Sequence, residues 1–107
     1  MSKEYTYLPA HTLWSINQYV KEGQSVGDFL YAVLTNNLLK AVANADDQNS
    51  VRLSLIVRYI VNRCPAACHG SAERVAKWME HRGCKGLSEG DPSVTKHALS
   101  NLYEPGD

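Results

Sequence analysis

The residue types best suited to chemistry in this sequence are three cysteines and two histidines in its second half. They are Cys64, Cys68, His69, His81 and Cys84. Their spacing, C-x3-C followed by H-x2-C, is close to that of zinc ligands. However, residues 71–82 have the pattern of one helix, which would separate Cys68 from His81 by roughly 20 Å at about 1.5 Å per residue. Two ligands this far apart cannot share a metal ion, so we expect no metal and no other cofactor.

A cysteine nucleophile is the second chemistry to consider, because Cys68 stands next to His69. Adjacent side chains rarely face each other, and the sequence offers no third residue that would orient the histidine. Cys68 precedes a predicted helix start, where a thiolate is favoured, which predicts the most reactive thiol of the chain. No glycine-rich phosphate loop, G-x-S-x-G or H-E-x-x-H motif occurs. The sequence therefore predicts a protein that is not an enzyme.

The elements that must position these residues are predicted from helical spacing of apolar residues and from helix-capping residues. No alternating run of apolar and polar residues predicts a strand. A weaker fifth segment begins at Asp91 and Pro92. The four stronger segments run from Pro9 to Gly23, from near Gly27, from Asp46 or Asp47 to just before Pro65, and from Ser71 to Gly83.

These segments predict an all-α protein, a compact bundle of four helices plus a marginal C-terminal helix. The 107 residues leave room for one domain, which we place at 1–87, followed by an acidic tail at 88–107. Three cysteines are an odd number, which favours a reducing compartment over a disulfide framework. No apolar run reaches the ~18 residues of a membrane span, and the first residues lack the layout of a signal peptide. We therefore expect a cytoplasmic protein without a membrane span.

The stretch GDFLYAVLTNNLLKAVANADDQN has the pattern of an amphipathic helix that Asn36 and Asn37 interrupt. A buried amide without a partner costs about 1–3 kcal/mol, so these side chains should be satisfied. We favour a break in the helix, with an asparagine capping a second short helix, which would also turn Leu39 toward the core. The other interpretation is recognition, in which the amides bond across a helix interface or to a polar ligand. The asparagines involved would be Asn37, Asn44 and Asn49.

The third predicted helix is apolar on its back as well as on its main stripe, since Val51 and Leu55 project away from that stripe. A helix that is apolar nearly all round is either central in the bundle or covered by a partner. Leu39 raises the same question on the second predicted helix. Together these side chains predict a self-associating surface and thus a homo-oligomer.

The middle of the chain is basic, although the formal net charge is zero. Residues 51–87 hold seven Lys and Arg against two acids, whereas 1–50 hold three against five and 88–107 one against four. This asymmetry suits an anionic partner. The connection CPAACHGS is longer than the usual helix-turn-helix turn of about 3–4 residues, which makes nucleic acid a less favoured partner. The cations are Arg52, Arg58, Arg63, Arg74, Lys77, Arg82 and Lys85.

Three stretches are more specific in combination than any one alone: LPAHTLWSINQYV, GDFLYAVLTNNLLKAVANADDQN and IVRYIVNRCPAACHGSAERVAKWMEHR. Together they carry a Pro-x-x-Thr start, a Phe-Leu-x-Ala-Val-Leu block, an Ala-Asp-x-x-Asn turn and a Gly-Ser-x-Glu-x-Val-x-x-Trp ending. Over residues 8–82 this combination resembles a group of small proteins encoded by bacteriophages and prophages. The resemblance implies a bacterial host cell and no particular chemistry. Asn37 stands where the group more often has aspartate, and the tail falls outside the match.

Small phage-encoded domains without catalytic motifs often act by binding. Our first hypothesis is a non-enzymatic accessory protein that binds a host protein, in its concrete form an inhibitor of bacterial antiviral defence. One alternative is an oligomer that sequesters a small anionic nucleotide signal with its arginines and asparagines, and a second is a DNA-binding regulator. The candidate partner- or ligand-binding residues are Asn37, Leu39, Asn44, Asn49, Arg52, Leu55, Arg58 and Arg63.

Overall fold

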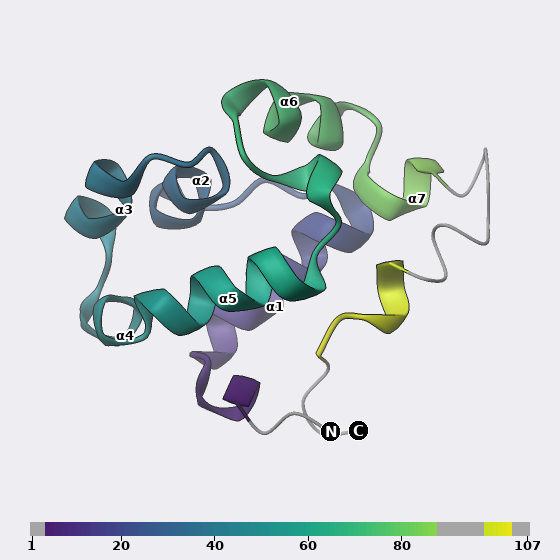
Figure 1. Ribbon diagram of the computed structural model, residues 1–107. Helices are drawn as coiled ribbons and strands as arrows, with labels where there is room; N and C mark the ends of the chain where they lie inside the picture. Colours follow the sequence, from purple (N-terminus) through teal and green to yellow (C-terminus); the bar gives the residue numbers. More distant parts are fainter. Residues whose placement is uncertain (1–3, 88–97, 104–107) are drawn as a thin grey trace.

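Helix α1 begins directly after Pro9 and ends at Gly23, whose φ of 68° closes the helix in the left-handed conformation. The computed structural model describes residues 4–87 and 98–103, and these residues are mostly helical and contain no strand. The all-α prediction is confirmed, and the radius of gyration of 13.2 Å is that of a compact domain. The elements in Figure 1 are η1 (Glu4–Tyr7), α1 (Ala10–Glu22), α2 (Asp28–Leu34), α3 (Leu38–Asn44), α4 (Asp47–Val51), α5 (Leu53–Arg63), η2 (Ala66–Cys68), α6 (Ala72–Glu80) and α7 (Gly83–Leu87).

The helix predicted from Gly27 breaks where the two adjacent asparagines stand. α2 ends at Leu34, Asn36 adopts the left-handed conformation with a φ of 65°, and α3 begins after Asn37. The side-chain oxygen of Asn37 accepts a hydrogen bond from the backbone N–H of Lys40 at 3.1 Å, which caps α3. The predicted break and its asparagine cap are therefore confirmed.

The break does not bury Leu39, contrary to our expectation. The side chain of Leu39 is 83% exposed and that of Leu38 is 65% exposed, so Ala41 is the buried residue of α3. A helix as short as α3 turns only a narrow face to the core, and Leu39 lies outside that face. The prediction that the break turns Leu39 toward the core is wrong.

The third predicted helix also divides into two. Asp46 caps α4 by accepting a hydrogen bond from the backbone N–H of Asn49 at 2.7 Å. Arg52 then leaves helical geometry, with φ −113° and ψ 12°, before α5 begins at Leu53. Within the described residues, five α-helices have seven residues or more. The predicted count of four helices is not confirmed, because two predicted segments each form two shorter helices.

Helix α1 is the central element, and α5 crosses it with one face buried (Figure 1). Six residues of α1 are buried, against three of α5. On α5, Ile56 and Ile60 are buried, whereas Val57 and Val61 are 39% and 60% exposed. The apolar character of the third predicted helix therefore does not reflect a central position, since part of its aliphatic surface faces solvent.

Two glycines let the end of α1 contact the start of α7. A Cβ added to Gly83 would stand 2.6 Å from the carbonyl oxygen of Val20 and 2.7 Å from the nitrogen of Gly23. A Cβ added to Gly23 would meet the backbone of Arg82 at 2.8 Å. Both glycines also have positive φ angles, 60° and 68°, which side-chain-bearing residues rarely adopt. The two backbones therefore pack directly against each other.

Residues 98–103, which belong to the predicted acidic tail, pack on α1 and α5. The side-chain amide of Asn17 donates to the carbonyl oxygen of Tyr103 at 2.9 Å, and the N–H of Tyr103 donates to the hydroxyl of Tyr59 at 2.9 Å. That hydroxyl donates in turn to Oδ1 of Asn17 at 2.6 Å. The closed network joins three distant parts of the chain. The rest of the predicted fifth helix and of the tail lies outside the described residues.

We expect Gly83→Ala to destabilise the fold by about 2–4 kcal/mol, because the methyl group adds left-handed backbone strain to a clash with the end of α1. Gly27→Ala is the matched control, since nothing lies within 4 Å of the position of its Cβ. That substitution should cost about 1 kcal/mol or less, the scale of a change at a helix N-cap. Urea unfolding followed by circular dichroism measures both free energies. Equal losses of stability would contradict the close approach at Gly83.

Candidate functional site

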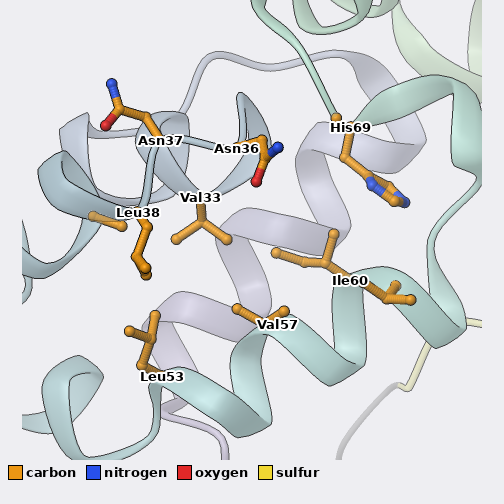
Figure 2. A pocket seen from close by; sticks show the side chains of 11 residues that line it. Val33, Asn36, Asn37, Leu38, Leu53, Val57, Ile60 and His69 are labelled. Carbon is orange, nitrogen blue, oxygen red and sulfur yellow. The ribbon is translucent and has the colours of Figure 1, made fainter.

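An open groove of about 370 Å³ lies between α2 and α3 on one side and α5 on the other. Figure 2 shows Val33 and Leu38 extending from the first side toward Leu53 and Val57 on α5. The groove is mainly apolar, with amides and an imidazole among its lining residues. These are Val33, Asn36, Asn37, Leu38, Ala41, Leu53, Val57, Ile60, Val61, His69 and Gly70.

The local sequence explains both walls of the groove. On α5, Leu53, Val57 and Val61 recur every four positions, which places them on one face over successive turns. The opposite wall depends on the asparagine break, because Leu38 is the first residue of the redirected helix α3. An uninterrupted helix through Asn36 would not present Leu38 at this place. The break thus shapes the groove as well as capping a helix.

Several aliphatic side chains of the groove face solvent. Leu38 is 65% exposed, Val61 60% and Val57 39%. Single exposed aliphatic residues are common on protein surfaces, but a contiguous apolar groove with a polar rim is typical of an interaction site. The arrangement can bind an apolar surface.

His69 is the titratable residue of the groove. Among the described residues, its Nε2 atom is the buried side-chain nitrogen or oxygen that has no hydrogen-bond partner. Burial lowers the pKa of His69 below its usual value of 6.5, and the positive charge of Arg74 lowers it further. Arg74 is held nearby because its guanidinium donates to the carbonyl oxygens of Ala66 and His69 at 3.2 and 3.3 Å. The imidazole is therefore neutral at pH 7.

The three asparagines proposed for recognition make separate hydrogen bonds. Asn37 lines the groove, beside Asn36, which our sequence reasoning had considered only for the break. The Asn44 amide donates to the carbonyl oxygen of Lys40 in the same helix at 2.9 Å. Asn49 is buried, and its Oδ1 accepts a hydrogen bond from the hydroxyl of Thr12 at 2.6 Å. Bonding across a helix interface, one of the two forms of recognition considered, therefore occurs at Asn49.

The predicted arginines do not gather around these asparagines. Arg63 lies 5.3 Å from the centre of the Tyr5 ring and donates to the carbonyl oxygen of Asn101 at 3.5 Å. Arg52 and Arg58 are exposed, and none of the three arginines lines the groove. The sequence signal for this wall of the groove is the four-residue spacing of Leu53, Val57 and Val61, which does not by itself show that Val57 and Val61 are exposed.

The predicted self-associating residues lie outside the groove as well. Leu39 and Val51 are 83% and 75% exposed. Leu55, by contrast, is half-buried and packs against the core cluster. The structure therefore leaves Leu39 on α3 and Val51 on α4 exposed outside the groove, whereas the groove gathers its exposed aliphatic side chains around one cavity.

Asn44 and Asn49 line a second cleft of about 370 Å³, together with Asp28 and Asp46. Nε2 of His11 lies 3.6 Å from a carboxylate oxygen of Asp46, and both side chains are more than half exposed. The carboxylates of this cleft would repel an anionic nucleotide. The combination of arginines and asparagines that the nucleotide hypothesis requires is thus not assembled there.

The three cysteines gather in the core instead of forming a reactive or metal-binding site. Cys64, Cys68 and Cys84 are buried and free. A side-chain hydrogen bond with Cys68 and burial raise the pKa of Cys64, and burial raises the pKa of Cys84. Cys68, predicted to be the most reactive thiol, is fully buried, as Cys84 nearly is, and its rank among the three thiols stays a prediction. In residues 4–87 and 98–103, no three His, Cys, Asp or Glu side chains form a group able to hold a metal ion.

Comparisons of the chain with protein families, with curated proteins and with solved structures found no match. The helices in the described part of the chain include none with both the length and the apolar character needed to cross a membrane. The functional interpretation therefore depends on the groove and on the residues that surround it.

We expect the stability of the protein to fall as the pH drops through the range below 6.5, in part because of His69. Its pKa is lowered in the folded state, so the unfolded chain binds this proton more readily and the free energy of unfolding decreases toward the folded pKa. His69→Asn removes this contribution while leaving the other titrating groups in place. Urea unfolding at about pH 7.5 and about pH 5 measures, for the wild type and for the variant, how much the free energy of unfolding changes between the two pH values. A wild type that loses no more stability than the variant would refute this assignment.

Proposed function

We propose that this protein is a non-enzymatic accessory protein that binds a host protein through the groove between α3 and α5. The single observation that supports the proposal is the set of exposed aliphatic side chains gathered around one open cavity. The resemblance to phage and prophage proteins favours a partner in the bacterial cytoplasm. An inhibitor of bacterial antiviral defence is the concrete form that we propose.

The physical basis of this binding is burial of apolar surface. Burying a fully exposed aliphatic side chain contributes about 1.5–3 kcal/mol, and Leu38, Val57 and Val61 can gain the part of this that corresponds to their exposed fractions of 65%, 39% and 60%. A few such residues at the centre of an interface commonly carry most of its affinity. The amide of Asn36, among the residues that line the groove, is suited to a hydrogen bond that orients the partner.

A homo-oligomer is the second candidate, favoured by the exposure of Leu39 and Val51 outside the groove. In that arrangement a second copy covers these residues and leaves the groove open for the host protein. The two candidates require different residues. Binding of the host protein through the groove depends on Val61, whereas the homo-oligomer depends on Val51.

We expect Val61→Glu to abolish capture of the host partner and Val51→Glu to preserve it. The two residues have the same type, 60% and 75% exposure, and positions inside and outside the groove. A charge placed in the groove would have to be buried without a partner when the complex forms. Quantitative mass spectrometry of proteins retained from a bacterial lysate by tagged wild type and each variant measures the effect, and circular dichroism verifies that all three fold.

Capture of the same proteins in the same amounts by all three forms would contradict a groove-dependent function. The proposed inhibition of antiviral defence is tested by a separate measurement. This is the plating efficiency, on cells that express the wild type or one of the variants, of a phage that the host defence restricts. Wild type and Val51→Glu should restore plating, whereas Val61→Glu should not. Restoration by Val61→Glu would contradict a defence inhibitor that acts through the groove.

A further inference from the structure

A second cavity, of about 400 Å³, lies between η2 and α6 and shares no lining residue with the groove. Its volume is within the range of about 300–1,000 Å³ that is typical of sites for small molecules. Its lining residues are Ala66, Ala67, Arg74, Lys77, Trp78 and His81. Within the described part of the chain, this lining includes two cations and no aspartate or glutamate. We call it the basic cavity.

The helical spacing of α6 places the positive charges of the basic cavity beside each other. Arg74 and Lys77 are three positions apart, so their side chains are neighbours on one face of the helix. His81, the C-cap residue of α6, follows four positions after Lys77 on the same side. An anion in this cavity therefore meets two adjacent cations.

The guanidinium of Arg74 has a fixed position at the basic cavity. Its Nη1 atom donates to the carbonyl oxygens of Ala66 and His69 at 3.2 and 3.3 Å. The N–H groups on Nε and Nη2 have no acceptor among the residues that the structure describes. Guanidinium N–H groups in such a fork match the oxygens of a phosphate group. Arg74 thus offers oriented donors to an anion.

Lys77 forms an ion pair with Glu73, a residue that does not line the basic cavity. Its Nζ atom lies 3.3 Å from a carboxylate oxygen of Glu73, and the two side chains are 70% and 78% exposed. An ion pair this exposed contributes little stability, because water screens both charges. The ammonium group of Lys77 can therefore turn to an anion in the cavity at little cost.

The rest of the lining suits an apolar group. Ala66 and Ala67 are exposed methyl-bearing residues of η2, whereas Trp78 is buried. The indole N–H of Trp78 donates to the carbonyl oxygen of Tyr19 at 3.0 Å, which fixes the ring and uses its donor. These three side chains therefore offer apolar atoms to a ligand, and burial of apolar surface against them is favourable.

We propose that the basic cavity binds a small phosphate monoester, with the phosphate group at Arg74 and Lys77 and an apolar body against Ala66, Ala67 and Trp78. A phosphate monoester carries a charge of about −1.5 to −2 at neutral pH. This charge suits two adjacent cations better than the single charge of a carboxylate does. The basic cavity is a second site, separate from the groove to which we assign the host protein.

Isothermal titration calorimetry of the full-length protein at low ionic strength tests the proposal with phenyl phosphate, inorganic phosphate, benzoate and phenol. We expect phenyl phosphate to bind at least about tenfold more tightly than each of the other three, because it alone combines a dianionic group with an apolar body. Equal affinity for any of the other three, or no binding of phenyl phosphate, would overturn the inference.

Two variants place the binding in the basic cavity. Arg74→Gln should weaken binding of phenyl phosphate by at least about tenfold, the scale of a lost hydrogen bond to a charged group. Lys77→Gln should weaken it by about two- to fivefold, because an exposed charge contributes less. Arg58→Gln is the matched control, since it removes one positive charge at an exposed residue that lines neither cavity.

Equal losses of affinity in Arg58→Gln and Arg74→Gln would overturn the inference, because binding would then follow net charge. Circular dichroism verifies that each variant folds. Since Arg74 also bonds to the chain before α6, Lys77→Gln decides the matter if Arg74→Gln does not fold. Wild-type affinity in Lys77→Gln would likewise contradict the site.

Adenosine monophosphate and glycerol phosphate distinguish two sources of a phosphate monoester, nucleotides and phosphorylated polyols. We expect adenosine monophosphate to bind more tightly, because its base supplies the apolar body that glycerol lacks. Tighter binding of glycerol phosphate would contradict the role of Ala66, Ala67 and Trp78 and overturn the inference. None of these substitutions changes a residue that lines the groove, so the outcome is independent of the proposed host interaction.

Discussion

The buried polar side chains of α1 are the constraint on which the rest of the structure depends. Thr12 donates to Asn49 at 2.6 Å, and Asn17 accepts from Tyr59 at 2.6 Å. The hydroxyl of Tyr19 donates to the carbonyl oxygen of Cys68 at 2.7 Å. An unpaired buried group of this kind costs about 1–3 kcal/mol, so each bond holds another part of the chain in one position relative to α1. A central helix without polar residues would specify these positions less uniquely.

The groove follows from this arrangement. Because α5 directs Tyr59 toward Asn17 and buries Ile56 and Ile60, the face that carries Val57 and Val61 is turned away from α1. The helix that begins at Asp28 would continue past Leu34 if its backbone remained helical. The left-handed Asn36 prevents this continuation, and the chain returns as α3 at a distance that leaves the cavity open. The left-handed backbone at Asn36 and the hydrogen bond between Tyr59 and Asn17 thus together define the groove.

Such a groove is suited to binding an apolar surface. Its walls are helices fixed by the core, so a partner meets a largely preformed surface and little conformational entropy is lost on binding. The cysteine thiols, which are the side chains best able to act as nucleophiles, lie outside the groove. The three thiols are buried, and burial and hydrogen bonding raise the pKa values of Cys64 and Cys84, which disfavours their thiolates. His69, the titratable residue of the groove, is kept neutral by burial and by Arg74.

The sequence by itself determined several helix ends, including those at Gly23 and Asn37, because capping and left-handed turns depend on residues only a few positions apart. It did not predict the break at Arg52, which has no capping residue. The tertiary structure decided which faces are buried. Apolar periodicity shows that α5 has an aliphatic face but not whether another element covers it, and the side of α3 on which Leu39 lies is set by packing. The pairing of Asn49 with Thr12, 37 positions away, likewise depends on how α4 meets α1. Burial is a relation between distant segments, and a local pattern contains no information about the partner that a face will meet.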